Sequence, residues 1–177
     1  MYKRQSTIRP IPEYIPASRG YEATFSDWKN KVKGEYPLQM FNKHYFRRSH
    51  TEFNNVLQLR EAFPQEFFMN PIDAAARGIK NSDTVKITSS EGSSIRHVLT
   101  TERLMPGVTI LPHGAWTEFD DSLEVDKAGS DNYLEAGVAL GEGNFGYNSQ
   151  IVQVEKWDGA RLMPDSQWPQ RIPIKEV

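Results

Sequence analysis

Residues 83–101 of this 177-residue chain, DTVKITSSEGSSIRHVLTT, decide its fold class. In the first half, Val85 and Ile87 alternate with polar residues, which predicts a strand with one buried face. Glu91-Gly92 is typical of a hairpin turn, and Ser94–Thr101 supplies a returning strand. The middle of the chain is therefore expected to be a β-hairpin.

Other short strands are expected on both sides of the hairpin, at Tyr36–Asn42, Glu66–Met69, Val108–Leu111 and Gln150–Lys156. In the last of them, Val154 and either Ile151 or Val152 should face inward. Two short helices are expected between the strands. One is Asn54–Phe63, before Pro64, and the other starts at Asn70 as N-cap with Pro71 in its first turn. Many short strands with so little helix predict a mainly β, barrel-like domain, not an alternating α/β sheet.

The two ends of the chain have a different character. Proline at positions 10, 12 and 16 favours an extended segment, and Tyr21–Lys33 has room for one short helix at most. The sequence predicts a barrel over residues 36–157. An extended arm or linker over 1–35 and a C-terminal arm over 158–177 should flank it. The proline-rich start and the tail after Pro164 should pack on domains outside this chain. Their apolar residues for such packing are Ile8, Ile11, Ile15, Trp168 and Ile172.

Composition excludes several classes of function. The formal net charge of −2 and the pI of about 6.1 argue against bulk binding to nucleic acid or to an anionic membrane. No apolar run reaches the roughly 20 residues that a membrane span needs. The chain has no cysteine, which excludes disulfides, thiolate zinc sites and Fe–S ligation by its own residues. No signal peptide is visible at the start of the chain.

One loop is expected to bind a ligand that carries phosphate and a polar heterocycle. It follows the first barrel strand and contains His44, Arg47, Arg48, Ser49, His50 and Thr51. Arginine offers a planar fork of donors that matches phosphate oxygens, and His and Ser add adjustable hydrogen bonds. The alternative is a solvated basic loop, since short basic runs are common.

Two further loops have compositions suited to the same ligand, and they contribute His113, Trp116, Asn132, Tyr147 and Asn148. Asparagine can pair with the edge of a purine-like or pterin-like ring, and Trp and Tyr supply a flat wall. The alternatives are a turn role for Asn132 and a core role for Trp116. His44 and His50 are six residues apart, which is wrong for two metal ligands on one helical face. No catalytic or metal-ligating residue is assigned.

The order of the motifs resembles the C-terminal domain of molybdopterin-dependent oxidoreductases of the dimethyl sulfoxide reductase family. Within it, the closest resemblance is to the catalytic subunit of anaerobic dimethyl sulfoxide reductases. The matching pieces include Tyr36-Pro37-Leu38-Gln39, Arg48-Ser49-His50, Asn70-Pro71-Ile72-Asp73-Ala74, Met105-Pro106-Gly107-Val108, Gly114-Ala115-Trp116 and Val152-Gln153-Val154-Glu155-Lys156. Glu135 departs from the pattern, because the family often has Thr there, and a carboxylate would repel phosphate.

The resemblance implies a six-stranded double-psi β-barrel that binds a bis(molybdopterin guanine dinucleotide) molybdenum cofactor. It implies that the metal ligand and any Fe–S cluster lie in a missing upstream part, so this chain alone is not expected to be catalytic. The implied partners are the upstream catalytic domains of the same subunit, an Fe–S electron-transfer subunit and a membrane anchor subunit. Neither nucleic acid nor direct membrane insertion is expected.

By the same resemblance, the whole enzyme would reduce S-oxides or N-oxides such as dimethyl sulfoxide in anaerobic respiration. It would work in the periplasm or in another membrane-associated location outside the cytoplasm. One alternative is a relative that acts on another oxyanion or sulfur compound. The other is a non-catalytic β-barrel binding module, because one fold serves many functions.

Overall fold

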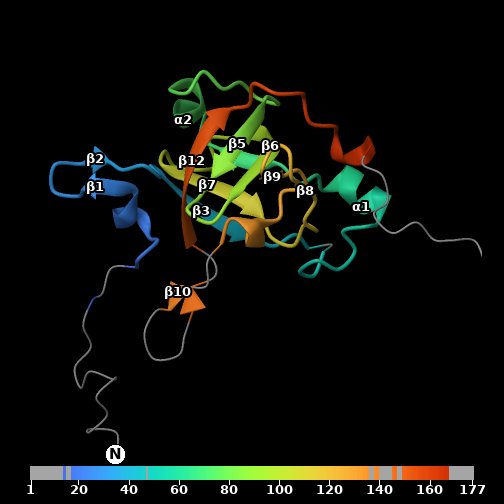
Figure 1. The fold of residues 1–177 in the computed structure, drawn as a ribbon, viewed down its shortest axis with the longest axis horizontal. Helices are drawn as coiled ribbons and strands as arrows, with labels where there is room; N and C mark the ends of the chain where they lie inside the picture. The colour runs from blue at the N-terminus through green and yellow to red at the C-terminus, as the bar shows by residue number, and fades with distance from the viewer. Residues whose placement is uncertain are drawn as a thin grey trace, which may run out of the picture.

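Six strands close into a barrel in the computed structural model, which describes residues 14, 17–46, 48–135, 138–139, 145–146 and 149–167 (Figure 1). The strands are β3 (Leu38–Lys43), β4 (Phe67–Met69), β5 (Thr84–Thr88), β6 (Ser93–Thr100), β7 (Val108–Pro112) and β12 (Ser149–Lys156). They pair in the order β4-β7-β3-β12-β5-β6, and β6 pairs back onto β4. The pairs β3–β7 and β4–β6 are parallel, and the other four are antiparallel. The mainly β double-psi β-barrel expected from the sequence is confirmed, and closure satisfies the strand edges.

The inward faces of the strands build the core. Val85 and Ile87 are both fully buried, as their alternation predicts. On β12 the inward residues are Val152 and Val154, and Val152 lies opposite Leu38 in the antiparallel register. The buried core residues are Leu38, Met40, Phe67, Met69, Ala74, Ile79, Val85, Ile87, Val98, Leu111, Leu134, Val152 and Val154.

The two short helices lie outside the barrel, and both are confirmed. Helix α2 (Pro71–Ala75) starts where expected, because the Asn70 side chain accepts a 2.8 Å hydrogen bond from the backbone N–H of Ile72. Helix α1 (Leu57–Ala62) is shorter than Asn54–Phe63, since the residues before it form turns. Val56, the N-cap residue, has an extended backbone with φ −84° and ψ 110°, so the helix begins only after it.

The remaining elements are short. They are the 3-10 turns η2 (Tyr21–Thr24), η3 (Asp131–Tyr133) and η4 (Asp165–Gln167), and the strands β1 (Phe25–Asp27), β2 (Val32–Lys33), β8 (Phe119–Asp120), β9 (Val125–Asp126), β10 (Val138–Ala139) and β11 (Phe145–Gly146). Strand β9 pairs with β6, and β8 pairs with β9, so this pair extends the barrel sheet on one side.

Residues 21–33 form more structure than expected. Instead of one short helix at most, η2 is followed by the antiparallel hairpin of β1 and β2, which stands beside the barrel (Figure 1). The rings of Tyr21, Phe25 and Trp28 pack edge to face with centroids 5.0–6.2 Å apart. Lys31 Nζ lies 3.1 Å from the Trp28 ring centroid. Such aromatic packing shows no period of two, so strand periodicity could not predict this hairpin.

The described part of the C-terminal segment, residues 158–167, packs on the barrel itself. Leu162 is buried with Ile95 and Val125, and η4 lies beside α1 (Figure 1). Packing of the proline-rich start and of the tail after Pro164 on domains outside this chain stays a prediction. The apolar residues that the sequence assigned to the arms, Ile8, Ile11, Ile15, Trp168 and Ile172, lie outside the described residues.

A buried ion pair fastens this segment to the barrel. Arg96 on β6 is 1 % exposed, and its Nη2 lies 2.5 Å from Oδ1 of Asp165. Arg96 also donates to the backbone oxygens of Gln65 and Lys127, and the Gln65 N–H donates to the other oxygen of Asp165. Burial would raise the pKa of Asp165, but the Arg96 guanidinium and the Gln65 N–H hold it below its ordinary value.

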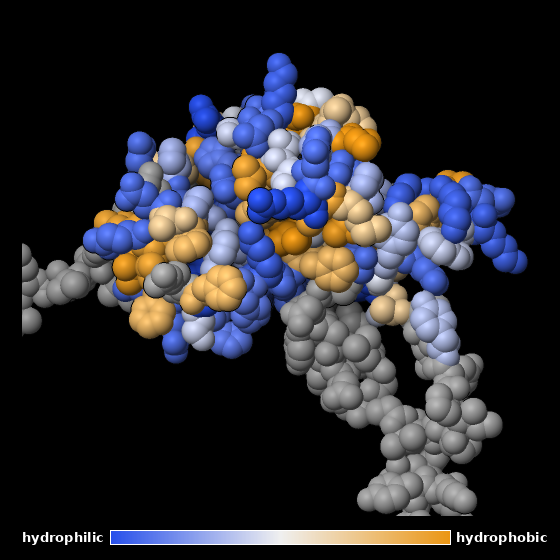
Figure 2. Space-filling view, turned by 180° about the vertical axis from the view of Figure 1, so that it is seen from behind, coloured by the Kyte–Doolittle hydropathy of each residue, from blue (hydrophilic) through white to orange (hydrophobic). Residues whose placement is uncertain are grey.

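Apolar side chains gather on the surface at the end of the molecule that carries α1, on the left in Figure 2. Leu57, the first residue of α1, is exposed, and so is Phe53, which lies shortly before α1 in the chain. Exposed apolar side chains that cluster in this way are typical of a contact surface.

Replacement of Asp165 by Asn should destabilise the chain strongly, because it leaves the Arg96 charge buried without its partner. Breaking a buried pair in this way costs about 3–5 kcal/mol. The measurement is the free energy of unfolding in urea. Asp158→Asn is the matched control, since Asp158 is an exposed acid in the same segment. Equal unfolding free energies for the two variants would contradict a structural role for the pair.

Candidate functional site

Two loops meet because the strands that precede them are parallel neighbours. Lys43 at the end of β3 lies opposite Pro112 at the end of β7. The next residues, His44 and His113, therefore leave the barrel side by side. Their rings stack with centroids 4.7 Å apart and planes tilted by 27°. The convergence of the first two predicted loops follows from this register.

His50 joins the pair from the far end of the first loop. Its Nδ1 lies 2.9 Å from Nε2 of His113, whose Nδ1 lies 2.5 Å from Oδ2 of Asp131 in η3. Because a carboxylate only accepts, His113 donates from Nδ1, and a neutral His113 then accepts from His50 at Nε2. In a neutral His50, which is an exposed residue, this assignment makes Nε2 an acceptor. Three loops thus carry one connected line of polar groups.

Asp131 anchors the line and was not predicted from the sequence. It is fully buried and accepts hydrogen bonds from His113, from the Gly114 N–H and from Nδ2 of Asn42. The residue predicted from the sequence is its neighbour Asn132, which is exposed in the same turn. An Asp inside a Gly-Ser-Asp-Asn loop has the composition of an ordinary turn, so its burial had no sequence signal.

Gly114 lets the two histidine loops approach each other. Its φ is +93°, and a Cβ at this position would lie 1.5 Å from the backbone oxygen of His50. Only glycine fits this conformation and this contact. Nearby, the indole N–H of Trp116 donates to the backbone oxygen of Thr51 at 2.8 Å. Trp116 is half-buried and outside the core, so the structure does not support its alternative core role.

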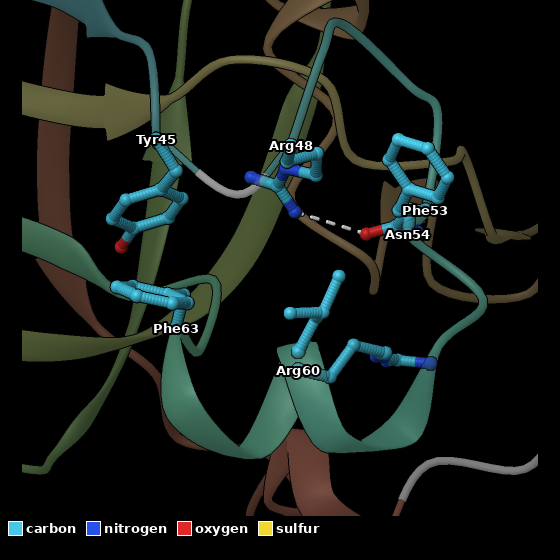
Figure 3. Close-up of a pocket in the computed structure, with 7 residues that line it drawn as sticks. Tyr45, Arg48, Phe53, Asn54, Arg60 and Phe63 are labelled. Atoms are coloured by element: carbon cyan, nitrogen blue, oxygen red, sulfur yellow. Dashed lines mark hydrogen bonds between the residues drawn. The ribbon is translucent and has the colours of Figure 1, made fainter.

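The Arg48 side chain points into the protein, where its hydrogen bonds anchor the first loop. Its Nη1 donates to Asn54 Oδ1 at 3.0 Å, as Figure 3 shows, and its Nη2 donates to Gln65 Oε1 and to the backbone oxygen of His113. The Tyr45 ring flanks the guanidinium, with its centroid 5.3 Å from Cζ. The Nε atom of Arg48 is buried and has no hydrogen-bond partner among the described residues. These contacts give Arg48 a positioning role.

Gln65 links this loop to the barrel and was also missed. It is 3 % exposed, and its Nε2 donates to the backbone oxygens of Pro112 and Gly129 while its Oε1 accepts from Arg48. One side chain therefore binds all three loops of the candidate site. A single Gln before a short strand carries no pattern that would have identified it.

The other predicted site residues fall into two groups. Ser49 and Thr51 are exposed in the turns of the first loop, where the backbone oxygen of Ser49 accepts from the N–H of Glu52. Arg47, Tyr147 and Asn148 lie outside the described residues.

The positive φ of His50, 49°, and of Phe53 shows backbone strain around this loop, and such strain often accompanies a functional site.

Glu135 lies beside the buried end of the site. Its Oε1 accepts a hydrogen bond from Nδ2 of Asn42, the same amide that donates to Asp131. Burial raises the pKa of Glu135 to about 7; the Asn42 bond opposes this shift, and the nearby Asp131 carboxylate reinforces it. This shift favours the uncharged acid over the carboxylate at Glu135. An uncharged Glu135 repels phosphate less than the carboxylate that was expected from the sequence.

This set of groups suits the organic part of a ligand. It offers imidazole edges, an indole wall and backbone groups, which match a heterocycle that both donates and accepts. In the part of the chain that the structure describes, no three His, Asp or Glu side chains are placed to hold a metal ion. Within the same part, no helix has the length and apolar character needed to cross a membrane.

Comparison with known proteins gives a family match. The model of the "Molydopterin dinucleotide binding domain" matches residues 38–148. The chain is 38% identical to the probable dimethyl sulfoxide reductase chain YnfF of Escherichia coli K12, over 87% of this chain and 18% of that protein. It is 38% identical to dimethyl sulfoxide reductase DmsA of the same organism, over 84% of this chain and 17% of that protein. It is 34% identical to the dimethyl sulfoxide/trimethylamine N-oxide reductase of Rhodobacter capsulatus, over 71% of this chain and 16% of that protein.

The chain thus spans less than a fifth of the length of these relatives. Among solved structures, acetylene hydratase from Pelobacter acetylenicus superposes with a TM-score of 0.62, over 84% of this chain and 21% of that one. The sequence identity of that pair is 16%, so the likeness shows a shared fold alone.

Replacement of Gly114 by Ala should separate the two histidine loops, because the new Cβ would overlap the His50 backbone. Gly78→Ala is the matched control, since Gly78 also has a positive φ, 65°, but has open space around it. The control should cost about 1–2 kcal/mol through backbone strain alone. Gly114→Ala should cost more and should shift the NMR signals of the His50 and His113 rings. Unchanged ring signals in Gly114→Ala would contradict the close approach.

Proposed function

This chain belongs to the molybdopterin dinucleotide binding domain family, and from that membership we propose that it holds a molybdenum cofactor in its bis(molybdopterin guanine dinucleotide) form. When bound, the cofactor supplies the redox chemistry, and the protein binds and orients it. The observation that carries the proposal is the convergence of His44, His50 and His113 over the buried Asp131.

Each described residue has a definite part in the proposal. His44 and His50 present ring edges to the heterocycle of the cofactor. Asp131 fixes the orientation of His113, which in turn orients His50. Trp116 forms a wall at the mouth and ties its loop to the first one. No metal ligand is needed from these residues, because they act on the organic part of the cofactor.

The arginines divide the remaining work. Arg48 positions the loop, since its Nη atoms already bind Asn54, Gln65 and the His113 backbone. Direct contact with phosphate is assigned to Arg47. The other proposed contacts with the cofactor are Ser49, Thr51, Asn132, Tyr147 and Asn148.

We further propose that the chain is the C-terminal part of an S-oxide or N-oxide reductase and is not catalytic by itself. The names of the relatives, dimethyl sulfoxide and trimethylamine N-oxide reductases, support this assignment. The apolar surface at the end of the molecule that carries α1 (Figure 2), with the exposed Phe53 and Leu57, is offered to the upstream catalytic domains. An Fe–S subunit, a membrane anchor subunit and a periplasmic location complete the proposal.

Replacement of His50 or His113 by Ala in the full-length subunit should lower cofactor content about tenfold, because a lost hydrogen bond near charged groups costs roughly 1.5 kcal/mol. Molybdenum is measured by plasma mass spectrometry and the released nucleotide by mass spectrometry. His97→Ala is the matched control, since His97 lies on β6 and makes none of the ring contacts of the cluster. A wild-type subunit without molybdenum, or with a nucleotide other than guanine, would overturn the proposed cofactor.

Arg47→Ala and Arg48→Ala should separate contact from positioning in the same subunit. Both should lower cofactor content, by about ten- to a hundredfold for one or two charge-assisted bonds. Arg48→Ala should also lower the free energy of unfolding, because it leaves Gln65 and Asn54 without their donor. Arg47→Ala should leave that free energy unchanged. Normal cofactor content in both variants would reduce this loop to a solvated basic turn.

A further inference from the structure

Two carboxyl groups lie against one amide at the buried end of the site. Asn42 on β3 directs its Nδ2 to Oδ2 of Asp131 at 3.0 Å and also to Oε1 of Glu135. Asp131 is fully buried and accepts two other N–H bonds, from His113 and Gly114. Three donors therefore satisfy the oxygens of this buried side chain.

Glu135 has less support for a negative charge. It is half-buried, and it shares its amide donor with Asp131. The titratable groups that face it are Asp131 from its own loop, which opposes a second charge, and His113 after β7, which favours one. His44 and His50 lie beyond His113, in ring contact with it. A second carboxylate beside Asp131 is therefore costly, and a proton removes the cost.

We propose, on the premise of the cofactor-binding function above, that Glu135 meets the cofactor as an uncharged carboxylic acid and donates its O–H to an anionic oxygen of the cofactor. Oε1 accepts from Asn42, so the proton resides on Oε2. A protonated Glu135 turns the expected repulsion into an attraction, because a carboxylic acid is a donor where a carboxylate only accepts. Binding then takes up one proton from solvent for each Glu135 that was ionised beforehand.

Cofactor retention should depend on pH through this group. If only the protonated form binds, affinity follows the fraction of Glu135 that is protonated. The pKa of Glu135 is about 7, so that fraction falls about tenfold between pH 6 and pH 8. A variant that cannot titrate at position 135 isolates this contribution.

The experiment compares wild-type and Glu135→Gln full-length subunits, dialysed at pH 6 and at pH 8. Molybdenum that remains bound and nucleotide that is released are measured by mass spectrometry. Gln keeps an N–H donor and an acceptor at the same place but does not titrate. The pH dependence of retention should therefore be about tenfold smaller in Glu135→Gln than in wild type. Glu135→Ala, which has no donor, should retain less cofactor than wild type at pH 6.

Equal pH dependence in wild type and Glu135→Gln would overturn the inference and leave the proposed function intact. A wild-type subunit without cofactor at either pH would instead contradict the proposed function. A second measurement does not depend on cofactor or on the folding of the Gln variant. The carboxyl ¹³C signal of Glu135 in the 177-residue chain should titrate near pH 7, and Asp131→Asn should lower that midpoint. A midpoint near 4.5, the ordinary value for Glu, would overturn the inference.

Discussion

The buried Arg96–Asp165 ion pair, together with the Gln65 residue that both partners bind, is the interaction on which the rest of the site depends. Arg96 belongs to β6, and Asp165 to the segment after the last barrel strand. Both bind the backbone of Gln65, whose side chain then holds the loops that follow β3, β7 and β9. All of these groups are buried and polar. Removal of one of them therefore leaves its partners without a hydrogen bond or counter-charge in a low dielectric, which is destabilising. The positions of the site loops are therefore set by their hydrogen bonds to buried barrel groups, and not by local sequence preferences.

The histidine cluster shows how strand topology becomes chemistry. Parallel pairing of β3 and β7 sets His44 beside His113, which no antiparallel pair would do from the same strand ends. Glycine at 114 allows the loop of His50 to close on them, and Asp131 sets the direction of the hydrogen bonds. Each of the three loops is short of regular structure, yet each is fixed by bonds to buried groups. A rigid barrel that presents polar loops at one end is a common arrangement for ligand binding.

The charge at this end of the barrel depends on a few local side chains. The overall charge of the chain is slightly negative, so attraction of an anionic cofactor must come from the site itself. Arg48 uses the donors of both Nη atoms inside the protein, whereas His44 and His50 are exposed. The burial of Glu135 next to Asp131 favours its neutral form, which lowers the negative charge that the site presents. In a loop that is basic in composition, Arg48 therefore has a structural role.

The sequence by itself determined the mainly β class, the positions of the barrel strands and the start of α2, because these depend on local periodicity and capping. Val85 with Ile87 and Asn70 with Pro71 each carry their signal within a few residues. The motif order also determined the family, and three of the chosen residues, His44, His50 and His113, do come together. Only the tertiary structure decided that Arg48 points inward, that Asp131 and Gln65 organise the loops, and that Glu135 shares a donor with another acid. Such roles depend on which distant backbone each side chain meets, and a local pattern contains no information about that partner.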